Sequence, residues 1–303
     1  MVSPAETTAV PLMTYPVLHH EADATSLWGQ RAHLRNIRME LIFLIAGAIA
    51  GSVSLGIVGA VDLAGLLAGL FFLAALTMRH VASTQRPEAR WYQGRAAAES
   101  VKTLAWRYAV GGDPFGLALS KSEVDRLFIA RLSDILGDLG DVMLTMVKGS
   151  GSAQITAEMR TMRELGLEAR KHAYASQRIE DQRRWYAAKA AYNTRRVRIW
   201  LTATLALEVA GVGTGILKAV RLFETQGDLL GIFATMVAAA TAWIQTKQHG
   251  TLATSYSVAA QELASVAALI EHQATDEEWE RFVGSSEGAI SREHTLWRAS
   301  KAK

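Results

Sequence analysis

The sequence predicts an all-α fold with four transmembrane helices, arranged as two hairpins that are each followed by cytoplasmic helices. Half of the 303 residues are hydrophobic, yet the mean hydropathy is only +0.11, so the apolar residues must be concentrated in blocks. These blocks come in two pairs with short connections, and the long charged segments between and after them are rich in helix-forming residues. This alternation is typical of a multi-pass membrane protein.

The first pair of apolar blocks predicts a transmembrane hairpin over residues 41–78. Leu41 to Val61 contains no charged residue, and Leu63 to Met78 contains none either, so only Asp62 separates them. A helix crosses the hydrocarbon core of a bilayer with roughly 20 apolar residues. The first block is long enough, and the second reaches across with help from its flanks or from a tilt.

The second pair predicts a hairpin over residues 199–246. Ile199 to Leu217 is apolar apart from Glu208, and Leu229 to Ile244 carries no charge. The alternative, that the four blocks are core helices of a soluble bundle, is disfavoured by their length and by their Gly and Ala content. The absence of a basic start and the depth of the first block also argue against a cleaved signal peptide.

The same plan occurs twice, which divides the chain into residues 1–150 and 151–303. The first unit holds the 41–78 hairpin and an amphipathic cytoplasmic helix whose apolar residues recur from Val124 to Met143. The second starts after the turn-forming segment Gly149 to Ser152. Because no Gly or Pro interrupts Ala169 to Trp200, we expect a stalk helix that runs into the third span. Cytoplasmic helices then follow the 199–246 hairpin.

The distribution of basic residues predicts that both termini are cytoplasmic. Thirteen Lys and Arg residues flank the spans on the side of the termini, whereas the two hairpin turns hold only Lys218 and Arg221. Cytoplasmic flanks of membrane helices carry such an excess of positive charge.

Nothing in the sequence predicts an enzyme, a cofactor or a metal site. There is no cysteine, the His residues lack metal-ligand spacing, and the net charge of +3 gives no reason to expect nucleic-acid binding. The glycine-rich stretches beginning at Lys148 and Gly211 lack the ordered Gly-Lys-Ser/Thr ending of a phosphate-binding loop.

Glu208 is the most informative residue of the spans. A charge near the middle of a span costs about 2.5–3.5 kcal/mol or more unless it meets water or a partner. Thr204, Glu208 and Gly211 follow one another on one helix face, which should point into a bundle. Either the carboxyl group lines a hydrated path, with Thr204 and Thr214 as further pore-lining residues, or it is a hydrogen-bonded group that holds two helices together.

Several motifs outside the spans resemble the SLATT family. The segment Arg95-Ala-Ala-Ala-Glu99-Ser-Val-Lys102-Thr-Leu-Ala-Trp106 follows the first hairpin, and Tyr15-Pro16 precedes it, as in one SLATT subtype. Residues 178–193 and 287–297 resemble a second subtype, often described as a domain of unknown function. The resemblance covers nearly the whole chain as two fused SLATT units.

The resemblance implies a bacterial membrane effector of antiviral defence or conflict systems, located in the inner membrane. Such domains are thought to form pores and to be encoded beside proteins that generate or sense nucleotides. It therefore implies the lipid bilayer, other copies of the chain and a separately encoded sensor or nucleotide signal as partners. Residues expected to serve subunit packing or signal reception, or merely to hold the helices together, are Arg95, Glu99, Lys102, Trp106, Trp185, Tyr186, Lys189, Glu287, Arg292, Glu293 and Trp297.

Two other functions remain open on the sequence alone. A constitutive channel or transporter is favoured by the two hairpins, which would form a parallel repeat around Glu208. A non-conducting scaffold that recruits proteins to the membrane would not require Glu208.

Overall fold

The fold is helical throughout nearly all of the chain that the computed structural model describes. It describes residues 10–53, 57–58, 61–139, 144–146, 153–220 and 228–301, with the backbone alone at residues 57, 58, 61 and 292–301. The longer helices are α1 (Val17–Gly51), α2 (Leu63–Gln85), α3 (Pro87–Val110), α4 (Lys121–Asp138), α7 (Asp181–Ala219), α8 (Leu229–Lys247), α9 (His249–Leu269) and α10 (Asp276–Lys301). The shorter ones are α5 (Ala157–Arg163), α6 (Leu167–Ala173), the π-helix η1 (Tyr174–Glu180) and the 3₁₀ helix η2 (Ile270–His272). The prediction of an all-α fold is confirmed.

The chain forms two compact units, and each unit draws on both halves of the sequence. The first unit contains Met1–Gly29, Glu88–Ala187 and Ser257–Lys303, and the second contains Gln30–Pro87 and Ala188–Tyr256. Three helices, α1, α7 and α9, contribute residues to both units.

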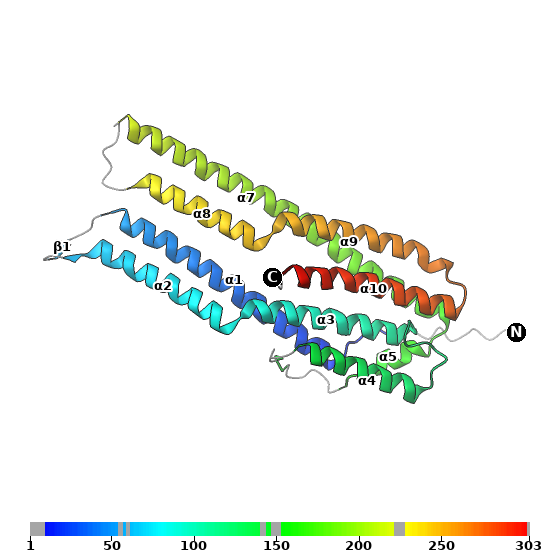
Figure 1. The fold of residues 1–303 in the computed structure, drawn as a ribbon. Helices are drawn as coiled ribbons and strands as arrows, with labels where there is room; N and C mark the ends of the chain where they lie inside the picture. The colour runs from blue at the N-terminus through cyan, green and yellow to red at the C-terminus, as the bar shows by residue number, and fades with distance from the viewer. Residues whose placement is uncertain are drawn as a thin grey trace. The chain divides into compact units, whose positions relative to one another are not determined.

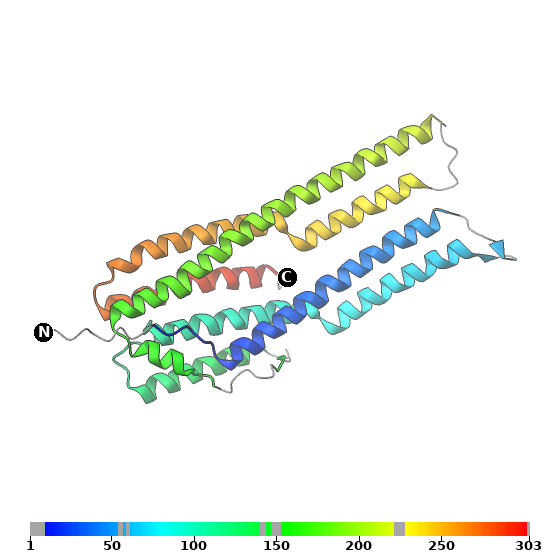
Figure 2. The same ribbon diagram turned by 180° about the vertical axis from the view of Figure 1, so that it is seen from behind.

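The second unit contains the apolar helices. In both ribbon views α2 runs beside the C-terminal half of α1, and α8 runs beside the C-terminal half of α7 (Figures 1 and 2). Glycines mediate the close approach: a Cβ atom at Gly47 of α1 would lie 3.4 Å from the Phe72 ring, and one at Gly211 of α7 would lie 3.6 Å from Phe233. Small residues allow such helix pairs to pack tightly in membranes.

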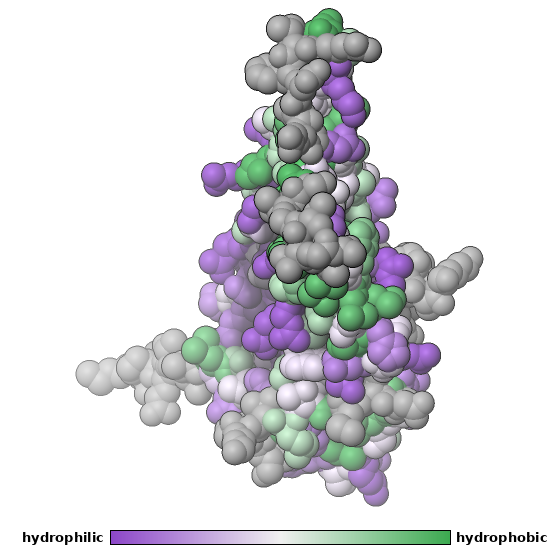
Figure 3. Space-filling model, turned by 90° about the vertical axis from the view of Figure 1, so that its left-hand side faces the viewer, coloured by the Kyte–Doolittle hydropathy of each residue, from purple (hydrophilic) through white to green (hydrophobic). Residues whose placement is uncertain are grey.

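Three described helices, rather than four, are long and apolar enough to cross a membrane. These helical stretches are Leu63–Val110, Leu167–Ala219 and Leu229–His272, whose most apolar 18-residue windows have mean hydropathies of 1.5–1.6. Their apolar side chains are exposed, as at Leu66, Leu201 and Val209, which are 56%, 67% and 64% accessible. Green apolar side chains also reach the surface in the space-filling view (Figure 3). Exposed apolar surface on this scale fits contact with lipid.

The prediction that Leu41 to Val61 forms one transmembrane helix is wrong. Helix α1 ends at Gly51, and the short strands β1 (Ile57–Val58) and β2 (Val61–Asp62) pair in antiparallel register. Glycines and β-branched residues follow one another from Gly51 to Val61, and both classes are poor helix formers. Asp62 is the N-cap of α2, where its Oδ1 accepts a hydrogen bond from the Ala64 N–H at 3.0 Å.

A similar joint follows each apolar helix that is C-terminal in its pair. Helix α2 gives way to α3 at Arg86, and α8 gives way to α9 at Gln248. These two residues have φ angles of 44° and 48°, the only positive values at non-glycine positions of the described chain. Because a left-handed residue interrupts a right-handed helix, each joint permits a change of direction between two helices.

The first unit has a polar and aromatic core. Helix α4 buries Val124, Phe128 and Leu132, as its apolar spacing predicts, and a capping box closes its N-terminus at Ser120. The predicted uninterrupted stalk is also present, since the helix continues from Leu167 to Ala219 through η1. A π-helical segment within a long α-helix often marks a functional position.

Candidate functional site

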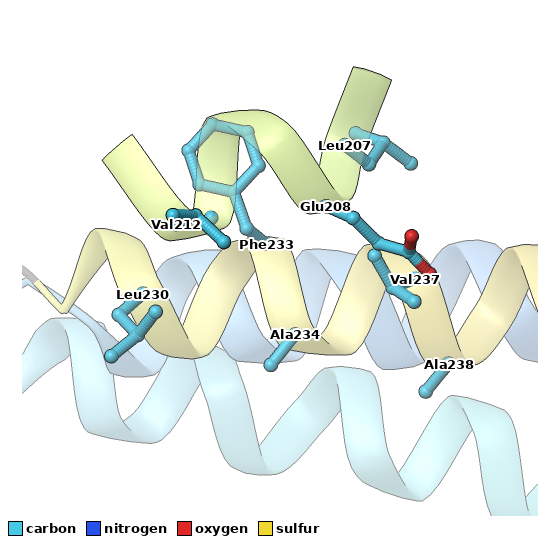
Figure 4. A pocket seen from close by; sticks show the side chains of 9 residues that line it. Leu207, Glu208, Val212, Leu230, Phe233, Ala234, Val237 and Ala238 are labelled. Carbon is cyan, nitrogen blue, oxygen red and sulfur yellow. The ribbon is translucent and has the colours of Figure 1, made fainter. Parts of the chain in front are cut away.

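Glu208 lies in a shallow apolar groove between α7 and α8 of the second unit. The groove encloses about 430 Å³ and is lined from α7 by Leu207, Glu208, Gly211 and Val212, and from α8 by Leu230, Phe233, Ala234, Val237 and Ala238. Figure 4 shows Glu208 extending from α7 toward α8, with Val237 beside it. The carboxyl group is the one ionisable group among these lining residues.

The structure gives the Glu208 carboxyl group no partner among the described residues. Its side chain is exposed, and no hydrogen bond or ion pair joins it to the described part of the chain. The two other predicted pore-lining residues are turned to their own helix: Thr204 Oγ1 donates to Trp200 O at 2.9 Å and Thr214 Oγ1 to Gly211 O at 2.8 Å. Glu208 is thus the only one of the three whose polar group is left without a bond, which the described helices do not explain.

A second candidate is a buried polar network in the first unit, centred on Glu287 of α10. Arg178 of η1 donates to both Glu287 oxygens, from Nε to Oε1 at 2.8 Å and from Nη2 to Oε2 at 2.7 Å. Thr103 of α3 donates to Oε2 at 2.9 Å, and the Tyr174 hydroxyl donates to Oε1 at 3.0 Å. The two charged side chains are 1% and 0% accessible, so the pair is removed from water.

The electrostatics of this network favour the charged forms of both partners. Burial alone would lower the pKa of Arg178, but the adjacent Glu287 carboxylate outweighs burial and raises it. Burial, followed by the Glu287 charge, raises the pKa of the Tyr174 hydroxyl well above its ordinary value, so Tyr174 stays a hydrogen-bond donor. Four donor atoms satisfy the carboxylate, which is what a buried charge requires.

The network continues toward the N-terminal segment through residues that the sequence analysis selected. Gln182 accepts hydrogen bonds from Arg178 Nη1 and from Lys102 Nζ, each at 3.2 Å. Lys102 also lies 5.9 Å from the centre of the Tyr15 ring, and the Trp106 indole donates to the Tyr15 hydroxyl at 3.1 Å. The structure therefore brings Lys102, Trp106 and Glu287 into one cluster, with Trp106 completely buried.

The remaining residues expected in packing or signal reception occupy different positions. Arg95 pairs with Glu99 at 2.7 Å and lies 5.7 Å from the Trp185 ring, while Tyr186 is buried beside Trp185. Lys189 is exposed on α7, away from the buried cluster. The side chains expected at Arg292, Glu293 and Trp297 lie outside the described residues.

Sequence reasoning did not select Arg178, Tyr174 or Thr103 as site residues. Arg178 precedes Glu287 by 109 positions, so no local pattern relates them. Arg178 does stand first in the motif that resembles the second SLATT subtype, which was the available signal. Among the described residues there is also no group of three or more His, Cys, Asp or Glu side chains placed to hold a metal ion.

Exposed apolar helices that hold a single carboxyl group, joined to a polar cytosol-type core, define a multi-pass membrane protein. Residues 16–171 match the family described as SMODS and SLOG-associating 2TM effector domain 3, and residues 174–297 match effector domain 1 of the same series. The chain belongs to the SLATT family and carries two SLATT domains in tandem, which confirms the resemblance. Comparisons with the curated proteins and with the solved structures found no match.

The family matches show that the buried network joins the two SLATT domains. Thr103 belongs to the first match, whereas Arg178 and Glu287 belong to the second. The π-helix η1 also begins at Tyr174, where the second match starts. The two domains therefore share one core in the first unit.

Proposed function

We propose that this chain is an oligomeric membrane effector of a bacterial conflict or antiviral system, which opens a path across the inner membrane when its cytoplasmic helices are triggered. The observation that carries the proposal is Glu208, an unpartnered carboxyl group in a groove of two apolar helices. Such groups in membrane segments usually face a bundle interior or a water-filled path. The family description, which names effector domains, supports the same reading.

Assembly with other copies would provide Glu208 with water or polar partners. In a single chain the carboxyl group borders Val237 and Ala238, neither of which can donate a hydrogen bond from its side chain. Lipid tails cannot donate either, so the ionised group would be strongly disfavoured. A ring of copies that turns this face inward would surround Glu208 with water, with Thr204 and Thr214 on the same route.

The proposed topology has two hairpins with both termini in the cytoplasm. The matched family is described as having two transmembrane segments per domain. The apolar end of α1, from Leu41 to Gly51, packs on α2 and would enter the membrane with it, although it is shorter than a full span. The excess of Lys and Arg on the side of the termini supports this orientation.

The trigger would act on the first unit, where the two SLATT domains share the Arg178–Glu287 network. Helices α1, α7 and α9 continue from this unit into the second. A shift of η1 or α10 that breaks the ion pair would therefore displace helices that also form the apolar unit. The family description associates these domains with SMODS and SLOG proteins, which supports a separately encoded nucleotide-handling partner. The proposal requires no catalysis by this chain.

The test is membrane potential in bacteria that express the chain with its neighbouring genes, measured with a voltage-sensitive dye. We expect triggered depolarisation with the native chain and a loss of at least tenfold in its rate with Glu208→Ala. Val209→Ala is the matched control, because it removes an exposed apolar side chain from the next position of α7. Membrane levels of the three proteins are matched by immunoblotting.

The outcomes separate the proposal from its alternatives. Depolarisation without any trigger that still requires Glu208 would support a constitutive channel. Absence of depolarisation in the native chain, with and without its neighbours, would exclude a pore and leave a membrane scaffold. If Glu208→Ala and Val209→Ala behave alike, Glu208 does not line the path.

A further inference from the structure

Two cations share one tryptophan ring at an end of the apolar helix α8. The Arg38 guanidinium carbon of α1 lies 5.4 Å from the centre of the Trp243 ring, and Lys247 Nζ lies 5.8 Å from it. All three residues belong to the second unit. Neither cation forms an ion pair or a hydrogen bond with a described residue, and the Trp243 indole N–H donates to none. Three sets of donors are thus available around one ring.

A third cation approaches the same place from α7. Arg196 is half-buried, lies 5.3 Å from the Tyr192 ring and donates from Nε to the Tyr192 hydroxyl at 3.0 Å. The Arg38 and Arg196 charges both act on Lys247, so the three cations from α1, α7 and α8 form one cluster. The Tyr192 ring in turn lies 6.4 Å from His249, which Asn193 holds through a 2.6 Å hydrogen bond.

The carboxylate nearest in sequence does not neutralise this cluster. Glu40, two positions after Arg38, is engaged by Arg79 of α2, whose Nη2 and Nε lie 2.7 and 2.9 Å from Glu40 Oε1. The side chains that act on the Lys247 charge are Tyr192, Arg38 and Arg196, with no carboxylate among them. Holding like charges together without a counter-ion is unfavourable, and a bound anion would relieve the repulsion.

We propose that Arg38, Arg196 and Lys247 form a binding site for the phosphate group of an anionic membrane lipid. Arginine donates in a planar fork that matches two phosphate oxygens, and lysine supplies a compact charge. The indole of Trp243 is amphipathic, which suits a residue at the level of the lipid headgroups. Because the three cations come from α1, α7 and α8, a bound phosphate would link helices of both SLATT domains.

The location favours a lipid over a soluble phosphate compound. Arg38 precedes the first apolar run, Arg196 precedes the third, and Lys247 follows the fourth, so each cation lies at the boundary of an apolar segment. Interfacial clusters of Lys and Arg recognise acidic lipid headgroups. This site is independent of whether the chain conducts ions, because it requires only that the apolar helices lie in a membrane.

The test is native mass spectrometry of the full chain in detergent, titrated with phosphatidylglycerol or with phosphatidylcholine. The cluster variant is Arg38→Gln/Arg196→Gln/Lys247→Gln. Its control is Arg35→Gln/Arg195→Gln/Arg198→Gln, which removes the same charge from exposed arginines on two of the same helices. We expect the native chain and the control to retain phosphatidylglycerol in preference to phosphatidylcholine, and the cluster variant to bind phosphatidylglycerol roughly tenfold or more weakly, given the contribution of each basic residue.

Further measurements protect the test against misfolding and against the wrong source of phosphate. Circular dichroism establishes that each variant folds, and the single variants Lys247→Gln and Trp243→Phe should show intermediate losses. Millimolar inorganic phosphate or glycerol phosphate should not displace the lipid, and displacement would identify a soluble phosphate ligand instead. Equal loss of lipid from the cluster variant and the control would overturn the site, as would equal retention of both lipids by the native chain.

Discussion

Arg178 and Glu287 form a fully buried ion pair, with Nη2 and Oε2 2.7 Å apart and side chains that are 1% and 0% accessible. The pair connects η1 to α10, and Thr103 extends it to α3 of the other SLATT domain. Removing two charges from water is costly, and excellent geometry compensates for this cost only while both partners remain. The integrity of the first unit should therefore depend on this pair more than on any exposed ion pair.

Replacing Arg178 by Met should destabilise the first unit by about 3–5 kcal/mol, because the buried Glu287 carboxylate then loses its counter-ion. Thermal unfolding of the purified chain, followed by circular dichroism, measures the effect. Arg183→Met is the control, since Arg183 pairs with Glu180 at the surface and should change the unfolding temperature little. Adding Glu287→Leu to Arg178→Met should restore part of the lost stability, and a further loss would contradict the assignment.

Stability should fall as the pH drops from about 6.5 to about 4, because His19 must remain neutral in the folded state. Burial, followed by the charges of His20 and Lys102, lowers the pKa of His19 from 6.5 to about 4, and its Nδ1 atom is buried without a partner. Between these values the unfolded chain binds the proton that the folded chain rejects, so unfolding is favoured as the pH decreases. The stability contributed by His19 is complete above pH 6.5 and absent below pH 4.

Denaturant titrations at pH 4.5 and 7.5 test this prediction. His19→Gln should reduce the difference in unfolding free energy between the two pH values by about 2–3 kcal/mol. His20→Gln is the matched control, because His20 is the exposed neighbour on the same helix, and it should retain most of the difference. An unchanged difference in His19→Gln would show that another group is responsible.

Gly94→Ala should destabilise the chain, although Ala is normally the better helix former. A Cβ atom at Gly94 of α3 would lie 2.8 Å from the Ser26 backbone nitrogen and 2.9 Å from the Ala22 carbonyl oxygen of α1. Backbone atoms cannot move aside as a side chain does, so the two helices must separate, at a cost of about 1–3 kcal/mol.

The control for Gly94 is Gly137→Ala in α4, where a Cβ atom would meet nothing within 4 Å. That substitution should raise stability by about 0.5–1 kcal/mol through helix propensity alone. Thermal unfolding of both variants gives the comparison. If Gly94→Ala is as stable as Gly137→Ala, α1 and α3 do not pack as closely as described.

Local pattern in the sequence determined much of the fold. The helical spacing of Val124, Phe128 and Leu132 predicted the buried face of α4, and the absence of Gly and Pro from Ala169 to Trp200 predicted the continuous stalk. The apolar blocks predicted the exposed membrane helices, and the motifs around Arg95 and Glu287 indicated the SLATT family. Each of these features depends on residues near one another in the chain, which is why composition and periodicity reveal them.

Only the tertiary structure decided which distant residues meet and where one apolar run stops being helical. Leu41 to Val61 is uniformly apolar, but hydropathy does not report the backbone preference that ends α1 at Gly51. The partner of Glu287 and the common position of Arg38, Arg196 and Lys247 arise from contacts between helices far apart in sequence. Hydrophobicity and helix propensity are local properties that a sequence displays directly, whereas the burial of a charge depends on how several helices pack together.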